Sequence, residues 1–275
     1  MKKIVEYSLI TILFIFSLIY TERASNIAKR EDPIMKSIIK NASSYNIDSV
    51  NALVSGDTIT PGIRGCVIDI NKSYEKMKRI NEYRDTLLRY KDLIPEITID
   101  NIYNKYISNG NKKKRQVSIV VNISNDITEI NSIASFNKEK INVFVDSVML
   151  ETKLLKVDKE YINIYNGGNN NNYDDITIEW MNDVILDNYN ESKYCINKNK
   201  NDDNLVICAR NKMHTISPKI IVKQNTYDVK ALIENGSIIY FDENNIKNID
   251  SIIKYVKSKG YEIVFLNELL NENMC

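Results

Sequence analysis

Three polar residues, Ser124, Asn125 and Asp126, directly follow a run of β-branched apolar residues and could take part in chemistry. The run begins at Gln116, and its apolar residues are nearly continuous rather than alternating, which is typical of a strand covered on both faces. In parallel α/β sheets and barrels, functional side chains lie just past the carboxyl ends of such strands. No glycine-rich phosphate cradle follows this run.

The histidine and cysteine content limits the chemistry further. His214 is the only histidine, so a site built from two or three imidazoles is excluded within one chain. We interpret His214 itself as a surface or turn residue. The four cysteines lack the paired C-x-x-C spacing of a zinc site. We therefore expect neither structural zinc nor another cofactor.

Carboxylates near the ends of the expected strands could in principle form an oxygen-only Mg²⁺ or Ca²⁺ site. Asp126, and Asp174 or Asp175, are better explained as helix N-caps, so we expect no metal site. The carboxylates considered are Asp126, Asp146, Asp174, Asp175 and Asp242.

The elements that would position these residues alternate between strands and helices from Gln116 onward, which indicates a mostly parallel sheet with crossover helices. The roughly 160 residues available are too few for a full eight-unit barrel, which typically needs about 250. This pattern fits an open doubly wound sheet and a reduced barrel equally well. After the run at 116–126, strands are expected at 141–145, 161–165, 219–222, 237–241 and 261–265, and helices at 147–155, 174–186, 227–234, 246–259 and 266–270.

The N-terminus has the layout of a signal sequence, with Lys2 and Lys3 ahead of an apolar run over residues 4–20. No small-x-small cleavage site follows Tyr20, so we favour an uncleaved membrane anchor over a cleaved signal peptide. Because a large domain behind a lone N-terminal anchor is most often exported, we expect a single anchor in the cell membrane with the body outside the cytoplasm.

The sequence predicts four consecutive parts. Asp32 and Pro33 have the pattern of a helix start. The basic run 112–115 follows a turn and is interpreted as a solvated boundary, with contact to an anionic wall polymer as the alternative. The parts are a membrane anchor (1–22), a helical linker (23–45), a small α+β unit (46–110) and a domain of βα units (111–275).

The run at 116–126 and the helix after it resemble the first strand of the NodB-like polysaccharide deacetylases, carbohydrate esterase family four, which carries a Thr-Phe-Asp-Asp-Gly signature. On that signature, Ser124 stands at the position of the base and Asn125 at that of the metal-binding aspartate. The resemblance implies an α/β fold of the reduced, distorted (β/α) barrel type. Residues 59–77 are similar to the region ahead of the deacetylase domain in membrane-anchored members from low-GC Gram-positive bacteria.

Two later stretches of the chain resemble the regions of the family's other motifs, but they lack the histidines of those motifs. The stretch 161–172 is similar to the region of the His-Ser/Thr-x-x-His metal motif, and it places Gly167 and Asn171 at the two histidines. Residues 236–243 resemble the region of the Leu-x-His motif, with Asp242 at the histidine that acts as general acid. Glycine offers no ligand and asparagine only a neutral oxygen. The Arg-Pro-Pro-Tyr motif has no match.

We therefore expect a membrane-anchored, exported protein that has lost deacetylase activity and binds or scaffolds cell-wall polysaccharide at the envelope. One alternative is a carbohydrate-active hydrolase or deacetylase with a non-standard site, in which Asp242 is the acid or base. Another is a structural module for protein interaction. With 37 basic and 36 acidic side chains, nucleic-acid binding is not expected, and the heavy use of asparagine gives asparagine tracts little functional weight.

Cys195 and Cys208 are expected to lie close together. Their flanks are strand-like and surround a polar turn at 200–203, and a hairpin would place the two cysteines directly opposite each other. Opposed Cβ atoms lie roughly 4.5–5.5 Å apart, which permits a disulfide after a small adjustment. Export would allow the bond to form. The alternative is a pair of reduced cysteines packed as apolar residues.

Overall fold

The computed structural model describes residues 2–152, 154–223 and 225–273. They form two compact units, which are described separately. The first combines the residues up to Ser49 with Arg64–Ile94, and the second combines Val50–Ile63 with Pro95–Asn273. The segment 46–110, interpreted from the sequence as one small α+β unit, thus contributes strands to both units.

The first unit is mainly helical. As predicted, Asp32 caps a helix that begins at Pro33, because its carboxylate accepts the N–H of Ile34 at 2.9 Å. The apolar face of this helix packs with Tyr74 and Met77 of the next helix. The elements are α1 (Lys2–Glu31), α2 (Pro33–Tyr45), β3 (Gly65–Ile68), α3 (Ile70–Ile80), the 3-10 helix η1 (Asp85–Leu87) and β4 (Tyr90–Leu93), with β3 and β4 antiparallel.

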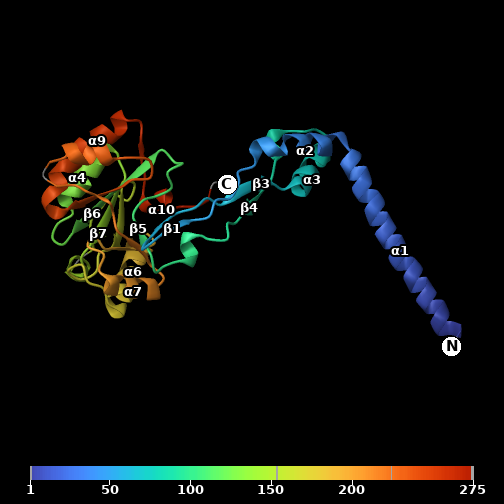
Figure 1. Ribbon diagram of the computed structural model, residues 1–275, viewed down its shortest axis with the longest axis horizontal. Helices are drawn as coiled ribbons and strands as arrows, with labels where there is room; N and C mark the ends of the chain where they lie inside the picture. The colour runs from blue at the N-terminus through green and yellow to red at the C-terminus, as the bar shows by residue number, and fades with distance from the viewer. Residues whose placement is uncertain (1, 153, 224, 274–275) are drawn as a thin grey trace. The chain divides into compact units, whose positions relative to one another are not determined.

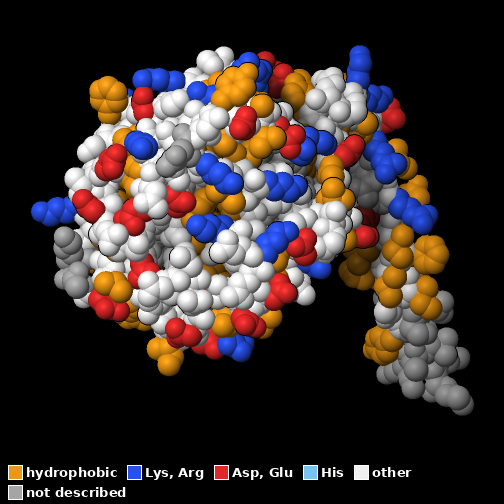
Figure 2. Space-filling view, turned by 60° about the vertical axis from the view of Figure 1, so that its left-hand side comes forward, with side chains coloured by type: hydrophobic (Ala, Val, Ile, Leu, Met, Phe, Trp, Pro, Cys, Tyr) orange, Lys and Arg blue, Asp and Glu red, His pale blue; other side chains and the backbone are white. Residues whose placement is uncertain are grey.

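The helix α1 contains the apolar run that we interpret from the sequence as a membrane anchor. Its described side chains include exposed apolar residues such as Leu13, Phe14 and Phe16. Figure 2 shows hydrophobic side chains, in orange, along the described part of this helix. Within the described residues, however, no helix has both the length and the apolar character required to cross a bilayer.

The central sheet of the second unit is built around β6 (Gln116–Ile123) and is parallel, with strand order β11-β12-β6-β7-β8. The nearly continuous apolar run of β6 is buried on both faces, as predicted. Ile119 and Val121 pack with the helices on one face, whereas Val120 packs toward a second sheet on the other. The other strands are β7 (Ile141–Val145), β8 (Ile162–Asn166), β11 (Ile220–Ile221), β12 (Ile238–Asp242) and β13 (Glu262–Ile263), which pairs with the start of β6.

A second sheet shares an apolar core with the central sheet. Tyr165 and Tyr240 from the central sheet pack there with Ile107 and Ile216 from the second. Two mainly parallel sheets around one core agree with the predicted α/β class and with a reduced, distorted barrel. The second sheet has the order β1-β2-β5-β10-β9, with β1 (Leu53–Ser55), β2 (Thr58–Thr60), β5 (Tyr106–Ile107), β9 (Tyr194–Ile196) and β10 (His214–Ile216).

Helices cover the outer face of the central sheet, where α4 and α9 lie together (Figure 1) and bury Ile130 and Ile253 in one core. The helices of this unit are η2 (Ile99–Asn101), α4 (Thr128–Asn137), α5 (Ser147–Thr152), α6 (Asp175–Asn188), α7 (Asp202–Arg210), α8 (Tyr227–Leu232), η3 (Glu243–Asn248), α9 (Ile249–Ser258) and α10 (Leu266–Leu269).

Two local predictions are wrong. The second arm of the predicted hairpin is the helix α7, because Asn201 caps it and its charges, acidic in the first turn with Arg210 in the last, favour a helix. His214 is not a surface or turn residue. It lies in β10 with 3% of its surface exposed, and its ring stacks on Tyr103 at 4.5 Å between centroids.

Candidate functional site

A cleft opens at the carboxyl ends of β6, β8 and β12, the edge at which parallel α/β folds place their functional groups. It consists of two adjoining hollows of about 270 and 220 Å³. Both hollows are lined by Asn122, Asn170, Asn171, Lys198 and Tyr240. The first is completed by Asn172, Ile196, Asn197, Asn199, Asn201 and Asn204, and the second by Ile123, Ser124, Asp146, Asp242, Glu243 and Asn244.

Neutral hydrogen-bonding groups form the centre of the cleft. Asn122, near the end of β6, donates a hydrogen bond from Nδ2 to Oδ1 of Asn171. Burial raises the pKa of Tyr240 to about 12, although its hydrogen-bonded neighbour Asn122 opposes the shift. The hydroxyl of Tyr240 therefore stays protonated at neutral pH. Lys198 adds one ammonium, with Nζ 5.6 Å from the centroid of the Tyr240 ring.

The three carboxylates of the second hollow are held by hydrogen bonds. Asp146 accepts the backbone N–H of Asn170 at 2.6 Å, and Asp242 accepts from Nδ2 of Asn245 at 2.6 Å. Glu243 accepts three hydrogen bonds from the residues that follow β6. These carboxylates thus fix the loops that form the walls of the hollow.

The structure brings most of the positions that correspond to the family's catalytic residues to this cleft. Asn125 lies beside the cleft rather than in its lining, and its Nδ2 donates to Oε2 of Glu243 at 3.0 Å. The hydroxyl of Ser124 donates to the same carboxylate at 3.1 Å. Of the positions that the resemblance assigns to catalytic residues, Ser124, Asn171 and Asp242 line the cleft.

Gly167 lies behind the lining, where there is no space for a side chain. A Cβ at this position would lie 2.6 Å from the carbonyl oxygen of Val145 and 3.2 Å from Oδ1 of Asn122. The donors at the positions of the family's metal ligands therefore do not fit a transition metal, because position 167 has none and Asn125 and Asn171 provide only amides. Within residues 2–152, 154–223 and 225–273, no three His, Cys, Asp or Glu side chains are grouped to hold a metal.

The other carboxylates considered for an oxygen-only site have structural roles. Asp174 caps α6, as expected for a helix N-cap, and the hydrogen bonds from Thr177 lower the pKa of its carboxyl group. Asp126 accepts the N–H of Thr128 at the start of α4. Asp175 pairs with Arg210 on α7.

Much of the lining, including Asn122, Lys198 and Tyr240, was not among the predicted site residues. A signal was present for two of them, because side chains two residues apart on a strand share a face. Asn122 precedes Ser124 by two residues, and Tyr240 precedes Asp242 by two. The asparagine tracts received little weight from composition alone, yet asparagine is the most frequent residue in the first hollow.

Comparison with solved structures identifies the class of this fold. The CE4 family pseudoenzyme BA3943 from Bacillus anthracis is similar with a TM-score of 0.61 at 19% identity, over 89% of this chain and 97% of that chain. A mutant of BA3943 with restored enzymatic activity gives a TM-score of 0.60 at 18% identity, over 88% and 99% of the two chains. The chain therefore has the CE4 fold, which confirms the resemblance to the polysaccharide deacetylases.

A sequence relative extends over most of the chain. It is the uncharacterized protein YlxY of Bacillus subtilis (strain 168), which is 23% identical over 279 residues, or 88% of this chain and 85% of the relative. No family model matches the sequence. The similarity to these solved structures therefore establishes the fold, whereas function depends on the residues of the site.

Proposed function

We propose that this chain is a catalytically inactive polysaccharide-deacetylase-like protein that binds an envelope glycan in the asparagine-lined cleft. The observation that supports the proposal is an open cleft lined mainly by amides. At the positions that the resemblance assigns to metal ligands stand amides and a glycine without space for a side chain. Amide groups both donate and accept hydrogen bonds, so the lining can pair with the hydroxyl and acetamido groups of a sugar chain.

Binding and catalysis are tested together on the full chain. Acetylated chitooligosaccharides and peptidoglycan fragments are titrated by calorimetry, and acetate release is followed with Zn²⁺, Co²⁺ or Mn²⁺ present. We expect saturable binding without metal-dependent acetate release. Asn122→Ala weakens binding, whereas Asn188→Ala does not, because Asn188 bonds to the carbonyl of Val184 in its own helix and lies outside the cleft. Acetate release, or the absence of binding, contradicts the proposal.

We also propose that the protein is exported with its body outside the cytoplasm. Lys2, Lys3 and the apolar run after them support a signal-type N-terminus. A disulfide joins Cys195 and Cys208, and such bonds persist in oxidising compartments. A membrane-impermeant protease added to intact native-host cells should degrade the chain and spare a cytoplasmic marker. Protection equal to that of the marker rules out export.

A second candidate function is a hydrolase that uses Asp242 as an acid or base. Asp146 and Glu243 line the same hollow as Asp242, which is the arrangement that favours this candidate. Bond cleavage in the same glycans without added metal distinguishes the hydrolase from the inactive glycan-binding protein. Cleavage that disappears in Asp242→Asn, with binding retained, supports the hydrolase.

A further inference from the structure

One disulfide closes the segment that forms a wall of the cleft. Cys195 lies on β9 and Cys208 on α7, with their Cα atoms 6.4 Å apart. The chain between them supplies six of the eleven residues that line the first hollow: Ile196, Asn197, Lys198, Asn199, Asn201 and Asn204. The bond therefore fixes both ends of this wall.

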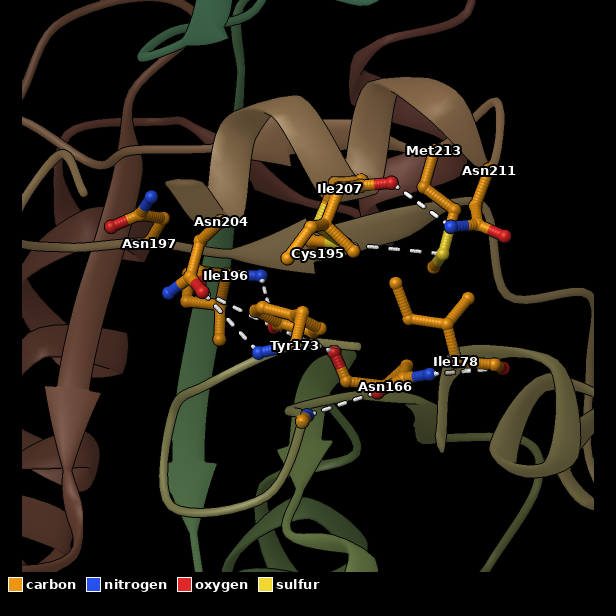
Figure 3. The surroundings of a disulfide bond; sticks show 12 residues. Asn166, Tyr173, Ile178, Cys195, Ile196, Asn197, Asn204, Ile207, Asn211 and Met213 are labelled. Atoms are coloured by element: carbon orange, nitrogen blue, oxygen red, sulfur yellow. Dashed lines mark hydrogen bonds between the residues drawn. A yellow bond between two sulfur atoms is a disulfide. The ribbon is translucent and has the colours of Figure 1, made fainter. Parts of the chain in front are cut away.

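A hydrogen-bond chain that is only partly buried connects the wall to the opposite side of the cleft. Asn204, on α7, donates from Nδ2 to the carbonyl of Asn171 at 2.9 Å. Its side-chain oxygen accepts the N–H of Tyr173 at 3.3 Å, as Figure 3 shows. The hydroxyl of Tyr173 accepts the N–H of Ile196 at 2.8 Å. Asn171 is the residue whose side chain accepts from Asn122 at the centre of the cleft. Asn204 on α7 thus contacts the backbone of the loop after β8, and a side chain of the same loop reaches Asn122 at the centre of the cleft.

Few apolar side chains hold α7 in place apart from the disulfide. The buried cluster around it contains the two cysteines and only Tyr173, Ile178 and Met213 among the described residues, with Ile207 packed at its edge. By comparison, the cores on either side of the central sheet are much larger. Within this small cluster, the disulfide links α7 covalently to β9.

We propose that the Cys195–Cys208 disulfide and Asn204 together position the asparagine-lined wall for glycan binding, so that reduction of the bond weakens binding. Asn204 is a positioning residue that acts through the backbone of Asn171. The inference rests on the proposed function for the identity of the ligand, but the order of the wall can be measured without any ligand. The reducing partner is a dithiol: it gives two electrons and two protons, the S–S bond becomes two thiols, and the dithiol becomes a disulfide.

The test compares the oxidised full chain, the same chain in dithiothreitol, and Cys195→Ala/Cys208→Ala. Amide hydrogen exchange is measured over residues 196–207 and at Tyr173. Cys66→Ser is the matched control, because Cys66 is disulfide-bonded in the other unit. We expect exchange at 196–207 to rise at least tenfold in dithiothreitol and in the double variant, with β6 and β7 unchanged. Cys66→Ser leaves the wall as in the wild type.

Affinity for acetylated chitooligosaccharide is measured on the same samples. It should fall about tenfold when the bond is lost and also in Asn204→Ala, while Asn204→Asp, which keeps the acceptor for Tyr173, retains part of it. Unchanged exchange at 196–207 overturns the proposal, and so does faster exchange with unchanged affinity. If the oxidised chain binds no glycan, the proposed function fails, and the exchange data alone decide whether the disulfide orders the wall.

Discussion

Asn122 and Asn171, 49 residues apart in sequence, are joined by a side-chain hydrogen bond across the centre of the cleft. The family resemblance places a metal-binding histidine at position 171, so an amide pair stands where an imidazole would hold a cation. Each amide satisfies part of the hydrogen-bonding need of the other, and neither carries a charge. This amide pair therefore offers hydrogen bonds but no charge.

The lack of space for a side chain at Gly167 gives the first prediction. Gly167→Ala forces the strand end away from Val145 and displaces Asn122, so stability should fall by about 1–3 kcal/mol, as in other overpacked sites, and glycan affinity should fall with it. Urea unfolding and calorimetry measure the two effects. Gly56→Ala is the control, because a Cβ there has nothing within 4 Å and the cleft is not lined by this residue. Its backbone strain lowers stability while affinity stays unchanged. Wild-type affinity in Gly167→Ala contradicts the prediction.

The contact between Asn125 and Glu243 gives a second prediction. Asn125→Asp replaces a hydrogen-bond donor with a carboxylate beside another carboxylate, so repulsion raises the pKa of the introduced carboxyl group. Because the folded state then prefers the protonated form, the cost is absent at low pH and appears as the pH rises above about 4. At pH 7 we expect a loss of about 1 kcal/mol relative to Asn125→Ala, since the site is exposed.

Thermal unfolding of Asn125→Asp and Asn125→Ala at pH 3.5 and pH 7 separates the two contributions. Asn125→Ala removes the donor without adding charge, so the difference between the variants reports the repulsion alone. Equal stabilities at pH 7 rule out the repulsion.

The sequence predicts the core of the fold well because β6 and the parallel strands beside it carry long apolar runs. It fails where two patterns compete over a short segment. Residues 202–210 combine a strand-like core, Val206 and Ile207, with the cap and charge pattern of a helix, and the helix forms because Asn201 supplies the cap. The predicted proximity of Cys195 and Cys208 is nevertheless correct, since the helix α7 also brings Cys208 within disulfide distance of Cys195 on β9.

The cleft could be predicted only in part. The family resemblance locates Ser124, Asn171 and Asp242, which do meet there. Lys198 and Asn204 belong to a segment with no strand-end pattern, and only the tertiary fold brings them to the lining. His214 shows the opposite failure, because a polar residue was placed at the surface while its strand, β10, lies between two buried neighbours, β5 and β9.

The buried His214 gives a third prediction. Burial lowers the pKa of its imidazole, and the nearby Asp100 opposes this shift. A lowered folded-state pKa means that the unfolded chain binds the proton more readily, so stability is retained above the unfolded pKa of about 6.5 and lost as pH falls below it. Each pKa unit corresponds to about 1.4 kcal/mol.

Urea unfolding at pH 7 and pH 5 measures this loss, and His214→Phe is the comparison because it keeps the ring stacked on Tyr103 without a titrating group. We expect the wild type to lose more stability than His214→Phe between the two pH values. Parallel losses in both proteins mean that other groups cause the pH dependence.

A buried amide at Asn142 gives the fourth prediction. Its Nδ2 donates to Oγ of Ser118 at 2.8 Å and to the carbonyl of Ile119 at 2.9 Å, and its Oδ1 accepts the N–H of Leu266 at 2.9 Å. This one side chain joins β6, β7 and the start of α10. Asn142→Leu leaves several buried polar groups without partners, each at a cost of about 1–3 kcal/mol, so we expect a total loss of about 2–4 kcal/mol.

Equilibrium urea unfolding of Asn142→Leu, Ser118→Ala and the double variant measures the network. Ser118 also donates to the carbonyl of Val264 at 2.8 Å, so its removal alone is destabilising. Because the two side chains share a hydrogen bond, the double variant should lose less stability than the sum of the single variants. Asn188→Ala is the control, since its Nδ2 bonds to the carbonyl of Val184 in its own helix, and it should cost less than about 1 kcal/mol. A loss in Asn142→Leu as small as that of the control contradicts the role of Asn142 as the junction of these three elements.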